Sequence, residues 1–374
     1  MNNGAGGGAR EGIAARLERL GMRLAELELD ALLVDSPVDL RYVSGYTGTN
    51  GLALLRPAGG PRPAFLTDFR YTTQSAAEVP AEYEQRTVTG ELRDSLPSLL
   101  GDDGGRLGVD ETKVTVHAHR RLQEQLGAGW ELEAANGLVE QQRAVKEPAE
   151  VAAIAAACAL ADEALRELLE EGLAGRTEHE VALELETRMR RLGAEEPSFP
   201  SIVAAAEHGA LPHAQPREKR IAPDVLVTID WGAKLDGYCS DCTRTFASGE
   251  DLLPEAREIY ELVLEAQVAG LQALRAGPSG REVDGAARAI VDAAGHGAFF
   301  GHGLGHGVGL EIHEAPRLSR TAPEQPLVAG NVVTVEPGVY LPDTLGVRIE
   351  DLAVVRDGGS DVLTGLSKEL TVVG

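Results

Sequence analysis

Two aspartates in one predicted hairpin are the first residues of this sequence that could bind a metal ion. Asp230 and Asp241 lie in the stretch Val225–Phe246, where two strand-forming runs flank a turn signal. A hairpin centred on Leu235-Asp236 places Asp230 directly opposite Asp241, with Cβ atoms about 4.5–5.5 Å apart. Two carboxylates at that distance repel each other unless a cation lies between them. The spacing therefore predicts a metal site, although a different register with one aspartate merely flanking the turn is the simpler structural alternative.

A histidine-rich segment and two later glutamates extend this set. Four of the nine histidines fall between positions 296 and 313, among glycines that argue against a helix and let backbone approach a ligand closely. Glu336 ends an apolar run, and Glu350 follows a strand that carries Arg348 on the same face. Two aspartates, one histidine and two glutamates suit two divalent cations, because four negative charges balance four positive ones. Oxygen-rich ligation with one imidazole fits manganese, cobalt or zinc.

Cys239 and Cys242 have a C-x-x-C spacing that could indicate zinc binding or a disulfide. On one strand, however, residues three apart point to opposite faces. We therefore expect both cysteines to be buried small apolar residues. With Cys158 the chain has only three cysteines, too few for a disulfide framework, which indicates a reducing compartment.

Composition restricts the classes of partner. The 374 residues suggest two or three domains, and 43% hydrophobic with 25% charged residues is typical of globular proteins. The net charge of −24 disfavours nucleic acid and anionic membrane surfaces as partners. Met1–Arg10 is polar and glycine-rich without an apolar signal segment, and the longest apolar run, Val151–Ala161, is too short to span a bilayer. We expect a cytoplasmic protein without nucleic-acid or membrane partners.

The elements that must position these residues divide the chain near residue 144. Before it, apolar periodicity predicts an α/β alternation, with helices over 11–28, 71–77, 91–100 and 118–126 and strands over 31–34, 52–55 and 64–66. After it, helices are predicted over 148–171, 178–192, 254–275 and 281–294, and strands over 201–205, 225–229, 238–246, 332–335 and 347–355. We expect an α/β domain over residues 1–144 and a mixed α+β domain over residues 145–374.

Several motifs, in this order, resemble those of the pita-bread metallopeptidases. They are FPSIVAAAEHGALPH, IDWGAKLDGYCSDCTRTF, GHGLGHGVGLEIHEAP, TVEPGVY and VRIED. Within that family they are similar to the proline-specific branch, aminopeptidase P and prolidase. QRAVKEPAEVAAI resembles the helix that opens the catalytic domain, and LRYVSGYTGTNG with FLTDFRY resembles the creatinase-like N-terminal domain of this branch. The resemblance covers nearly the whole chain and implies a creatinase-like α/β domain followed by an α+β pita-bread catalytic domain.

The resemblance also implies roles for individual side chains. The ligands of a dinuclear site would be Asp230, Asp241, His306, Glu336 and Glu350, with Asp241 and Glu350 bridging two divalent ions, manganese first among them. His213, His302 and His313 would contact the substrate or the tetrahedral intermediate. Arg348 would hold a ligand in place, and Glu336 would pass the proton of the attacking water to the leaving nitrogen. One departure is VAAAEHGA, where relatives often carry a glycine-containing turn, and it could alter the loop that carries His213.

The activity that this implies is a Xaa-Pro aminopeptidase, which acts on peptides with proline at the second position, as a homodimer. The alternative is a Xaa-Pro dipeptidase (prolidase), which must bind the free carboxylate of proline, for instance through an arginine such as Arg70 from the N-terminal domain or a second subunit. Methionine aminopeptidase does not account for the first 145 or so residues, and creatinase lacks the metal ligands. A catalytically inactive peptide-binding pita-bread protein is a distant alternative.

Overall fold

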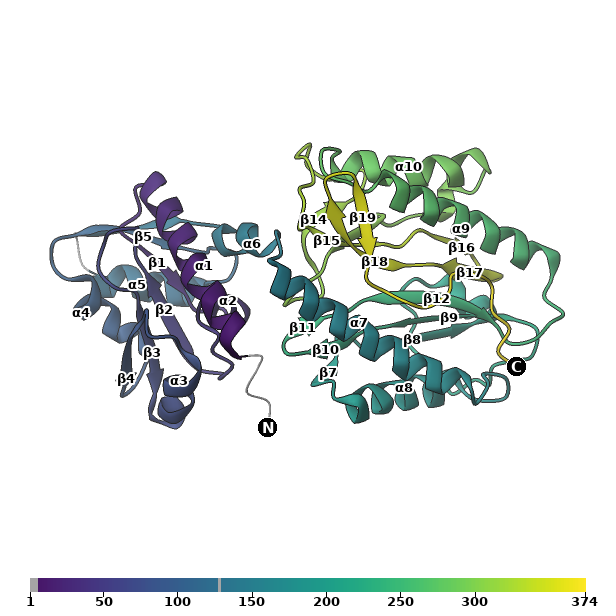
Figure 1. Cartoon of the computed structure of the whole chain (residues 1–374), viewed down its shortest axis with the longest axis horizontal. Helices are drawn as coiled ribbons and strands as arrows, with labels where there is room; N and C mark the ends of the chain where they lie inside the picture. Colours follow the sequence, from purple (N-terminus) through teal and green to yellow (C-terminus); the bar gives the residue numbers. More distant parts are fainter. Residues whose placement is uncertain (1–5, 127–128) are drawn as a thin grey trace. The chain divides into compact units, whose positions relative to one another are not determined.

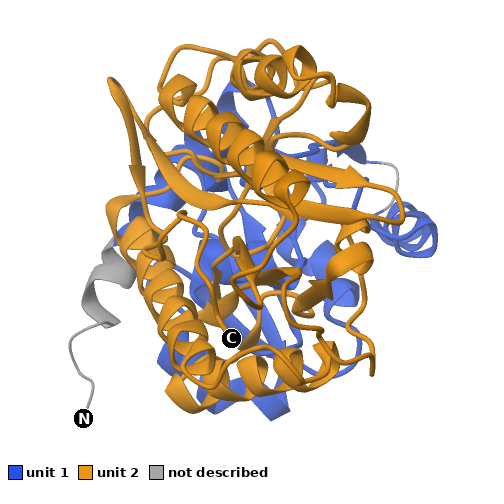
Figure 2. Ribbon diagram, turned by 90° about the vertical axis from the view of Figure 1, so that its right-hand side faces the viewer, with its two compact units in different colours: residues 1–143 blue, residues 144–374 orange. Residues whose placement is uncertain are grey.

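The computed structural model describes residues 6–126 and 129–374, and the chain divides into two compact units, residues 1–143 and 144–374 (Figures 1 and 2). The division falls one residue before the boundary expected from the sequence. The first half of the glycine-rich start, residues 1–5, lies outside the described residues. Among the residues that are described, no helix is long and apolar enough to cross a membrane.

The first unit is an α/β domain built on a mixed six-stranded sheet of order β4-β3-β2-β1-β5-β6. Its strands are β1 (Ala31–Val34), β2 (Gly51–Leu55), β3 (Ala64–Asp68), β4 (Glu84–Val88), β5 (Gly105–Val109) and β6 (Trp130–Ala134). Its helices are α1 (Gly6–Glu26), α2 (Pro37–Ser44), α3 (Thr72–Glu78), α4 (Leu96–Leu100), α5 (Val116–Leu126) and α6 (Leu138–Arg143), with 3-10 turns η1 (Phe69–Tyr71) and η2 (Leu92–Ser95). The three strands expected from apolar runs are the fully or almost fully buried β1, β2 and β3.

One helix predicted in this unit is wrong in extent. The single helix expected over 91–100 is a 3-10 turn, η2, followed by the short helix α4. Pro97 lies in the first turn of α4 and has no N–H to donate to the carbonyl of residue 93, so one regular helix does not run through the segment.

The second unit has two pairs of helices with strands between them (Figure 1). The helices are α7 (Pro148–Leu169), α8 (Glu178–Leu192), α9 (Pro254–Ala273) and α10 (Gly280–Ala293), with 3-10 turns η3 (Ala206–Ala210) and η4 (Gly297–Phe299). The sequence-predicted helix over 178–192 spans the same residues as α8, which begins with a capping box between Thr177 and Glu180.

The strands of this unit form four small sheets of order β11-β10-β7, β12-β9-β8, β14-β13-β15-β18-β19 and β16-β17. They are β7 (Glu196–Pro197), β8 (Ile202–Ala205), β9 (Leu226–Trp231), β10 (Ala233–Leu235), β11 (Tyr238–Cys239), β12 (Cys242–Ala247), β13 (Gly305–Gly307), β14 (Glu314–Leu318), β15 (Val332–Val335), β16 (Gly338–Leu341), β17 (Leu345–Arg348), β18 (Asp351–Arg356) and β19 (Gly359–Val362). The strand expected over 238–246 is wrong as a single element, because it divides into β11 and β12, which pair in different sheets with Asp241 between them. The single strand expected over 347–355 is wrong in the same way. Its two parts, β17 and β18, pair with different sheets, and Glu350 lies at the break between them.

Strand β9 shows how the helix layers orient the polar residues. Val227, Ile229 and Trp231 belong to the apolar core that includes residues of α7 and α8, and the Trp231 indole donates to the carbonyl of Ala161 on α7. Because side chains alternate along a strand, Asp230 points to the opposite face. A second apolar core joins α9 and α10 to strands β15 to β18. Asp230 is thus kept off the face of β9 that packs on helices.

The hairpin register predicted from the sequence is wrong by two residues. Thr243, not Asp241, pairs with Asp230, and Leu235 pairs with Tyr238 across the two-residue turn Asp236-Gly237. Both turn residues have positive φ, 48° and 77°, which Asp and Gly adopt at much lower cost than Leu235 would. Asp230 and Asp241 are therefore diagonal neighbours, still on the same face because the shift along β12 is two residues.

The expectation for the cysteines is confirmed. Cys158, Cys239 and Cys242 are free and buried. Cys239 packs with Cys158 and Val308, whereas Cys242 belongs to the core that contains Trp231. The two thiols of the C-x-x-C spacing are therefore separated between two apolar clusters and bind nothing together.

Candidate metal centre

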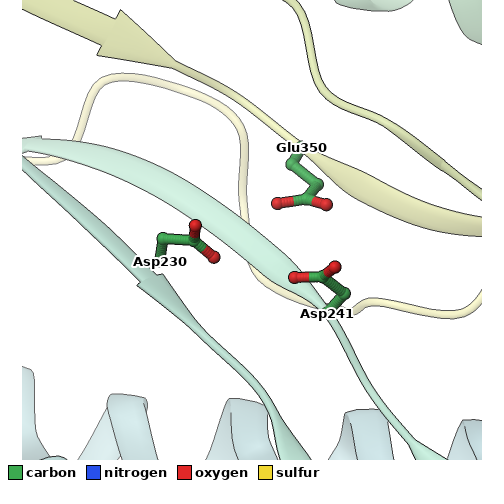
Figure 3. Close-up of side chains that lie close together, drawn as sticks. All are labelled: Asp230, Asp241 and Glu350. Atoms are coloured by element: carbon green, nitrogen blue, oxygen red, sulfur yellow. The ribbon is translucent and has the colours of Figure 1, made fainter. Parts of the chain in front are cut away.

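Three carboxylates from three different parts of the second unit converge on one point (Figure 3). Asp230 comes from β9, Asp241 from the residues between β11 and β12, and Glu350 from the break between β17 and β18. Oxygen atoms of all three lie within 4.8 Å of one another. Asp241 and Glu350 are 5% and 2% exposed.

His306 and Glu336 lie beside this carboxylate triad. His306 Nε2 is 3.6 Å from Asp241 Oδ2 and 3.3 Å from Glu336 Oε1. Its Nδ1 lies 3.1 Å from the carbonyl of Gly307, and its main-chain N–H donates to Thr334 Oγ1. Thr334 Oγ1 also lies 3.1 Å from Glu336 Oε1. The structure therefore brings together all five side chains expected as metal ligands.

The electrostatics of these residues favour the binding of a cation. Burial, together with the charges of Glu350 and Asp230, raises the pKa of Asp241 well above its ordinary value. Burial and the charges of Glu336 and Asp230 do the same to the pKa of Glu350. Burial lowers the pKa of His306, which keeps the imidazole neutral and able to donate a lone pair.

One buried atom offers a direct test of whether a cation fits. Asp230 Oδ1 is shielded from solvent and has no hydrogen-bond partner among the residues that the structure describes. A buried carboxylate oxygen without a partner is costly, and a cation would satisfy it and offset the repulsion within the triad. The oxygen-rich donor set with one neutral imidazole therefore fits divalent metal ions.

Arg348 holds the other oxygen of Asp230. Its Nη2 donates to Asp230 Oδ2 at 2.6 Å, and its Nη1 donates to Tyr340 Oη at 2.9 Å and to the carbonyl of Pro212 at 3.1 Å. The sequence predicted that Arg348 holds a ligand and associated it with Glu350. In the structure the ligand-type residue that it contacts is Asp230, on another strand.

Two positioning residues were missed by the sequence reasoning, Thr243 and Tyr340. The Thr243 hydroxyl donates to Glu350 Oε2 at 2.6 Å and accepts from Arg348 Nε at 3.0 Å, so it connects both side chains. Tyr340 Oη lies 2.9 Å from His302 Nε2 and accepts from Arg348. Thr243 could have been found from its place two residues after Asp241, on the same strand face. Tyr340 gave no such signal, because its partners come from distant segments.

Comparison with known proteins decides the family. Residues 152–357, more than half of the chain, match the model of metallopeptidase family M24. The chain belongs to family M24. Residues 16–145 match the creatinase/prolidase N-terminal domain. The expected order of a creatinase-like domain followed by a pita-bread domain is confirmed. Membership of family M24 also means that the chain is a peptidase that depends on divalent metal ions.

Relatives of this M24 metallopeptidase share most of its length. A Xaa-Pro dipeptidase of Pyrococcus horikoshii is 42% identical, over 91% of this chain and 94% of the relative. The solved structure of a Xaa-Pro dipeptidase from Bacillus anthracis is 38% identical, with a TM-score of 0.90 over 96% of this chain and 99% of that one. The structure of an X-Pro aminopeptidase from Thermotoga maritima is 35% identical, with a TM-score of 0.86 over 94% and 100%.

The three further histidines of this M24 metallopeptidase differ in environment. The His313 ring lies 4.3 Å from the His306 ring, centre to centre, and its side chain is exposed. His302 is partly buried between Gly303 and Tyr340. His213 is exposed and follows Pro212, whose carbonyl accepts from Arg348. His302 and His213 are therefore both connected to Arg348, one through Tyr340 and one through the main chain.

Glu178 holds the loop that carries His213. It lies at the start of α8, is 1% exposed, and accepts hydrogen bonds from the main-chain N–H groups of Ala205 and Arg217. Its carboxylate also binds His208 Nδ1 and the Arg217 guanidinium. In the same loop Ala206 has a φ of 54°, in the left-handed region. The departure seen in VAAAEHGA thus places an alanine where glycine fits without strain.

Proposed function

We propose that this M24 metallopeptidase is a dinuclear Xaa-Pro peptidase, which hydrolyses the bond between an N-terminal residue and a following proline. The observation that carries the proposal is the convergence of four carboxylates and one imidazole, with one buried carboxylate oxygen left without a partner. The names of the relatives from Pyrococcus horikoshii, Bacillus anthracis and Thermotoga maritima support the specificity for proline.

Five side chains would hold two divalent ions, namely Asp230, Asp241, His306, Glu336 and Glu350, with Asp241 and Glu350 shared. Four negative charges balance two divalent cations, and manganese is the proposed metal, with cobalt or zinc as substitutes. When bound, such a pair supplies an activated water at neutral pH and polarises the scissile carbonyl. Arg348 and Thr243 would keep Asp230 and Glu350 in place, as hydrogen-bonded outer residues do at metal sites.

The remaining side chains act on the substrate. Glu336, besides its place among the five proposed ligands, would take a proton from the attacking water and return it to the proline nitrogen. His313 or His302 donates a hydrogen bond to the oxyanion that develops on the scissile carbonyl. His213 binds the substrate backbone, and Tyr340 fixes the ring orientation of His302. An Xaa-Pro bond has no N–H, so a pocket shaped for the pyrrolidine ring selects it.

Longer peptides are the proposed substrates, with release of the N-terminal residue. A dipeptidase must bind the free carboxylate of proline, for which a free guanidinium is well suited. Arg348 is already engaged by Asp230, Thr243, Tyr340 and the carbonyl of Pro212. Xaa-Pro dipeptides are the second candidate, favoured by the names of the Pyrococcus horikoshii and Bacillus anthracis proteins.

The test is a competition between Ala-Pro-Ala and Ala-Pro in the presence of manganese, with Ala-Ala-Ala as the control for proline specificity. We expect release of alanine from Ala-Pro-Ala with the highest kcat/KM and none from Ala-Ala-Ala. A higher kcat/KM for Ala-Pro would make the chain a prolidase. Equal cleavage of Ala-Ala-Ala, or no metal-dependent cleavage at all, would contradict the proposed activity.

We further propose that the enzyme acts as a homodimer in the cytoplasm. Three free, buried cysteines support a reducing compartment. Sedimentation of the metal-loaded protein gives its mass, and a monomer at micromolar concentration would contradict the homodimer.

A further inference from the structure

Asp284 and Arg288 form a buried ion pair on the inner face of α10, outside the carboxylate cluster. They lie one helical turn apart and are 0% and 5% exposed. Arg288 Nε and Nη2 each donate to one oxygen of Asp284 at 2.8 Å, which is a two-pronged contact. The neighbours on this face, Val283, Ala287 and Val291, are apolar. A charged pair thus occupies a position where apolar packing would be expected.

The same pair forms hydrogen bonds with main-chain groups of residues 300–304, the segment that leads into β13. Arg288 Nη1 and Nη2 donate to the carbonyls of Phe300 and His302, both at 2.7 Å. Asp284 Oδ1 accepts from the main-chain N–H of Leu304 at 3.0 Å. The guanidinium also lies 4.0 Å from the centre of the Phe300 ring. Residues 300–304 are in neither a helix nor a strand, so α10 supplies hydrogen bonds that no neighbouring strand provides.

Stability alone is a weak reason for such a pair, because apolar residues of similar volume often stabilise a core as well. An apolar pair could not, however, bind two carbonyls and one N–H at alternate residues of an irregular segment. The residue in the middle of that segment is His302, whose ring lies between the carbonyl of Gly303 and Tyr340 Oη. A displacement of the main chain at His302 would move the ring away from Tyr340.

We propose that Asp284 and Arg288 are positioning residues for His302. The inference rests on the proposed function, since His302 acts on a substrate only if the chain is the proposed peptidase. The hydrogen bonds of the pair go to residues 300, 302 and 304 and to none of the five proposed ligands. His306 has its own main-chain contact with Thr334. Loss of the pair should therefore impair turnover without loss of metal.

The experiment uses Arg288→Lys, which keeps the charge but loses the planar fork. Arg281→Lys is the matched control, since Arg281 is on the same helix and pairs with the exposed Glu324. We expect Arg288→Lys to lower kcat for Ala-Pro-Ala about tenfold or more, as small misplacements of catalytic groups do. KM should stay within about twofold and the metal content unchanged. Arg281→Lys should match the wild type in all three.

A double-mutant cycle with His302→Ala separates positioning from a general structural role. If the pair acts through His302, Arg288→Lys has little further effect on kcat in the His302→Ala background. Equal losses in both backgrounds, or loss of bound metal, would overturn the proposal. If Arg288→Lys does not fold, the isosteric Asp284→Asn enters the same cycle.

A second readout keeps the inference distinct from the proposed activity. In zinc-loaded protein with ¹⁵N-labelled histidine, where the metal is diamagnetic, the imidazole signal that disappears in His302→Ala belongs to His302. Arg288→Lys should shift this signal and leave that of His306 in place, whether or not the chain cleaves Xaa-Pro bonds. An unchanged His302 signal would refute the positioning role even if the peptidase activity is confirmed.

Discussion

At the scale of single residues, the site consists of carboxyl groups held closer together than their charges favour. Asp241 and Glu350 are buried, and burial with mutual repulsion raises the pKa of both. Arg348 donates a hydrogen bond to one oxygen of Asp230, and Thr243 donates one to one oxygen of Glu350. These two bonds offset only part of the repulsion among the carboxyl groups. The residual repulsion is what bound cations would remove.

The first prediction follows from that repulsion. Asp241→Asn should lower the bound metal from about two ions per chain to less than one and abolish turnover. Without metal, the variant should melt at or above the temperature of the metal-free wild type, since a buried charge is gone. Metal analysis and thermal melting test both statements. Asp236→Asn, which removes the same charge from the exposed hairpin turn, should keep full metal content.

A second prediction concerns backbone strain at Ala206. A left-handed conformation costs a residue with a Cβ about 1–2 kcal/mol, and glycine avoids most of it. Because glycine is also more flexible in the unfolded chain, Ala206→Gly should raise the free energy of unfolding by about 0.5–1 kcal/mol. Denaturant unfolding measures it. Ala205→Gly, at a φ of −105°, should destabilise instead, and stabilisation by both changes would contradict the explanation.

At the scale of elements, the N-terminus of α8 and the loop after β8 are joined by one carboxylate. Burial alone would raise the pKa of Glu178, but hydrogen bonds from the Arg217 side chain, from the N–H groups of Ala205 and Arg217 and from His208 lower it overall. Because the folded pKa lies below the unfolded one, ionised Glu178 stabilises the fold above its ordinary pKa of about 4.3. That contribution is lost as the pH falls through the folded pKa.

The third prediction is therefore pH-dependent. Glu178→Gln should cost about 2–3 kcal/mol of unfolding free energy at pH 7, where charged hydrogen bonds are lost. The difference from the wild type should shrink below about pH 4, which urea unfolding at several pH values would show. Glu184→Gln, on the same helix with a partly exposed side chain, should cost less than about 1 kcal/mol. A pH-independent difference would mean that the charge of Glu178 is not the cause.

At the scale of the whole molecule, all five proposed ligands lie in residues 144–374, and each unit has its own apolar core. A metal that binds only the folded second unit stabilises it, by about 2.7 kcal/mol at one hundred times its Kd. Chelation should therefore lower the melting temperature of that unit by about 5–10 °C. Calorimetry before and after addition of a chelator tests this, and manganese should restore the transition. The absence of a shift would contradict metal binding.

The sequence predicted most helices and buried strands because their signals are local. Helix α8 has a capping box and an apolar face, and β1 is a continuous apolar run between polar residues. Strand β4 was missed because it is largely exposed and carries charged residues, so no apolar pattern marks it. Strand β6 was missed although Trp130, Leu132 and Ala134 alternate with two glutamates along it. Helix α2, which has eight residues, was also missed.

By itself, the sequence determined most helices, several buried strands, the family resemblance and the residue types expected at the site. The tertiary structure alone decided that Asp230 and Asp241 are diagonal neighbours, that Arg348 holds Asp230, and that Asp284 with Arg288 supports the segment of His302. The physical reason is that periodicity and capping act within a few residues of chain. Register and side-chain contacts between sheets depend on packing free energies summed over segments far apart in sequence.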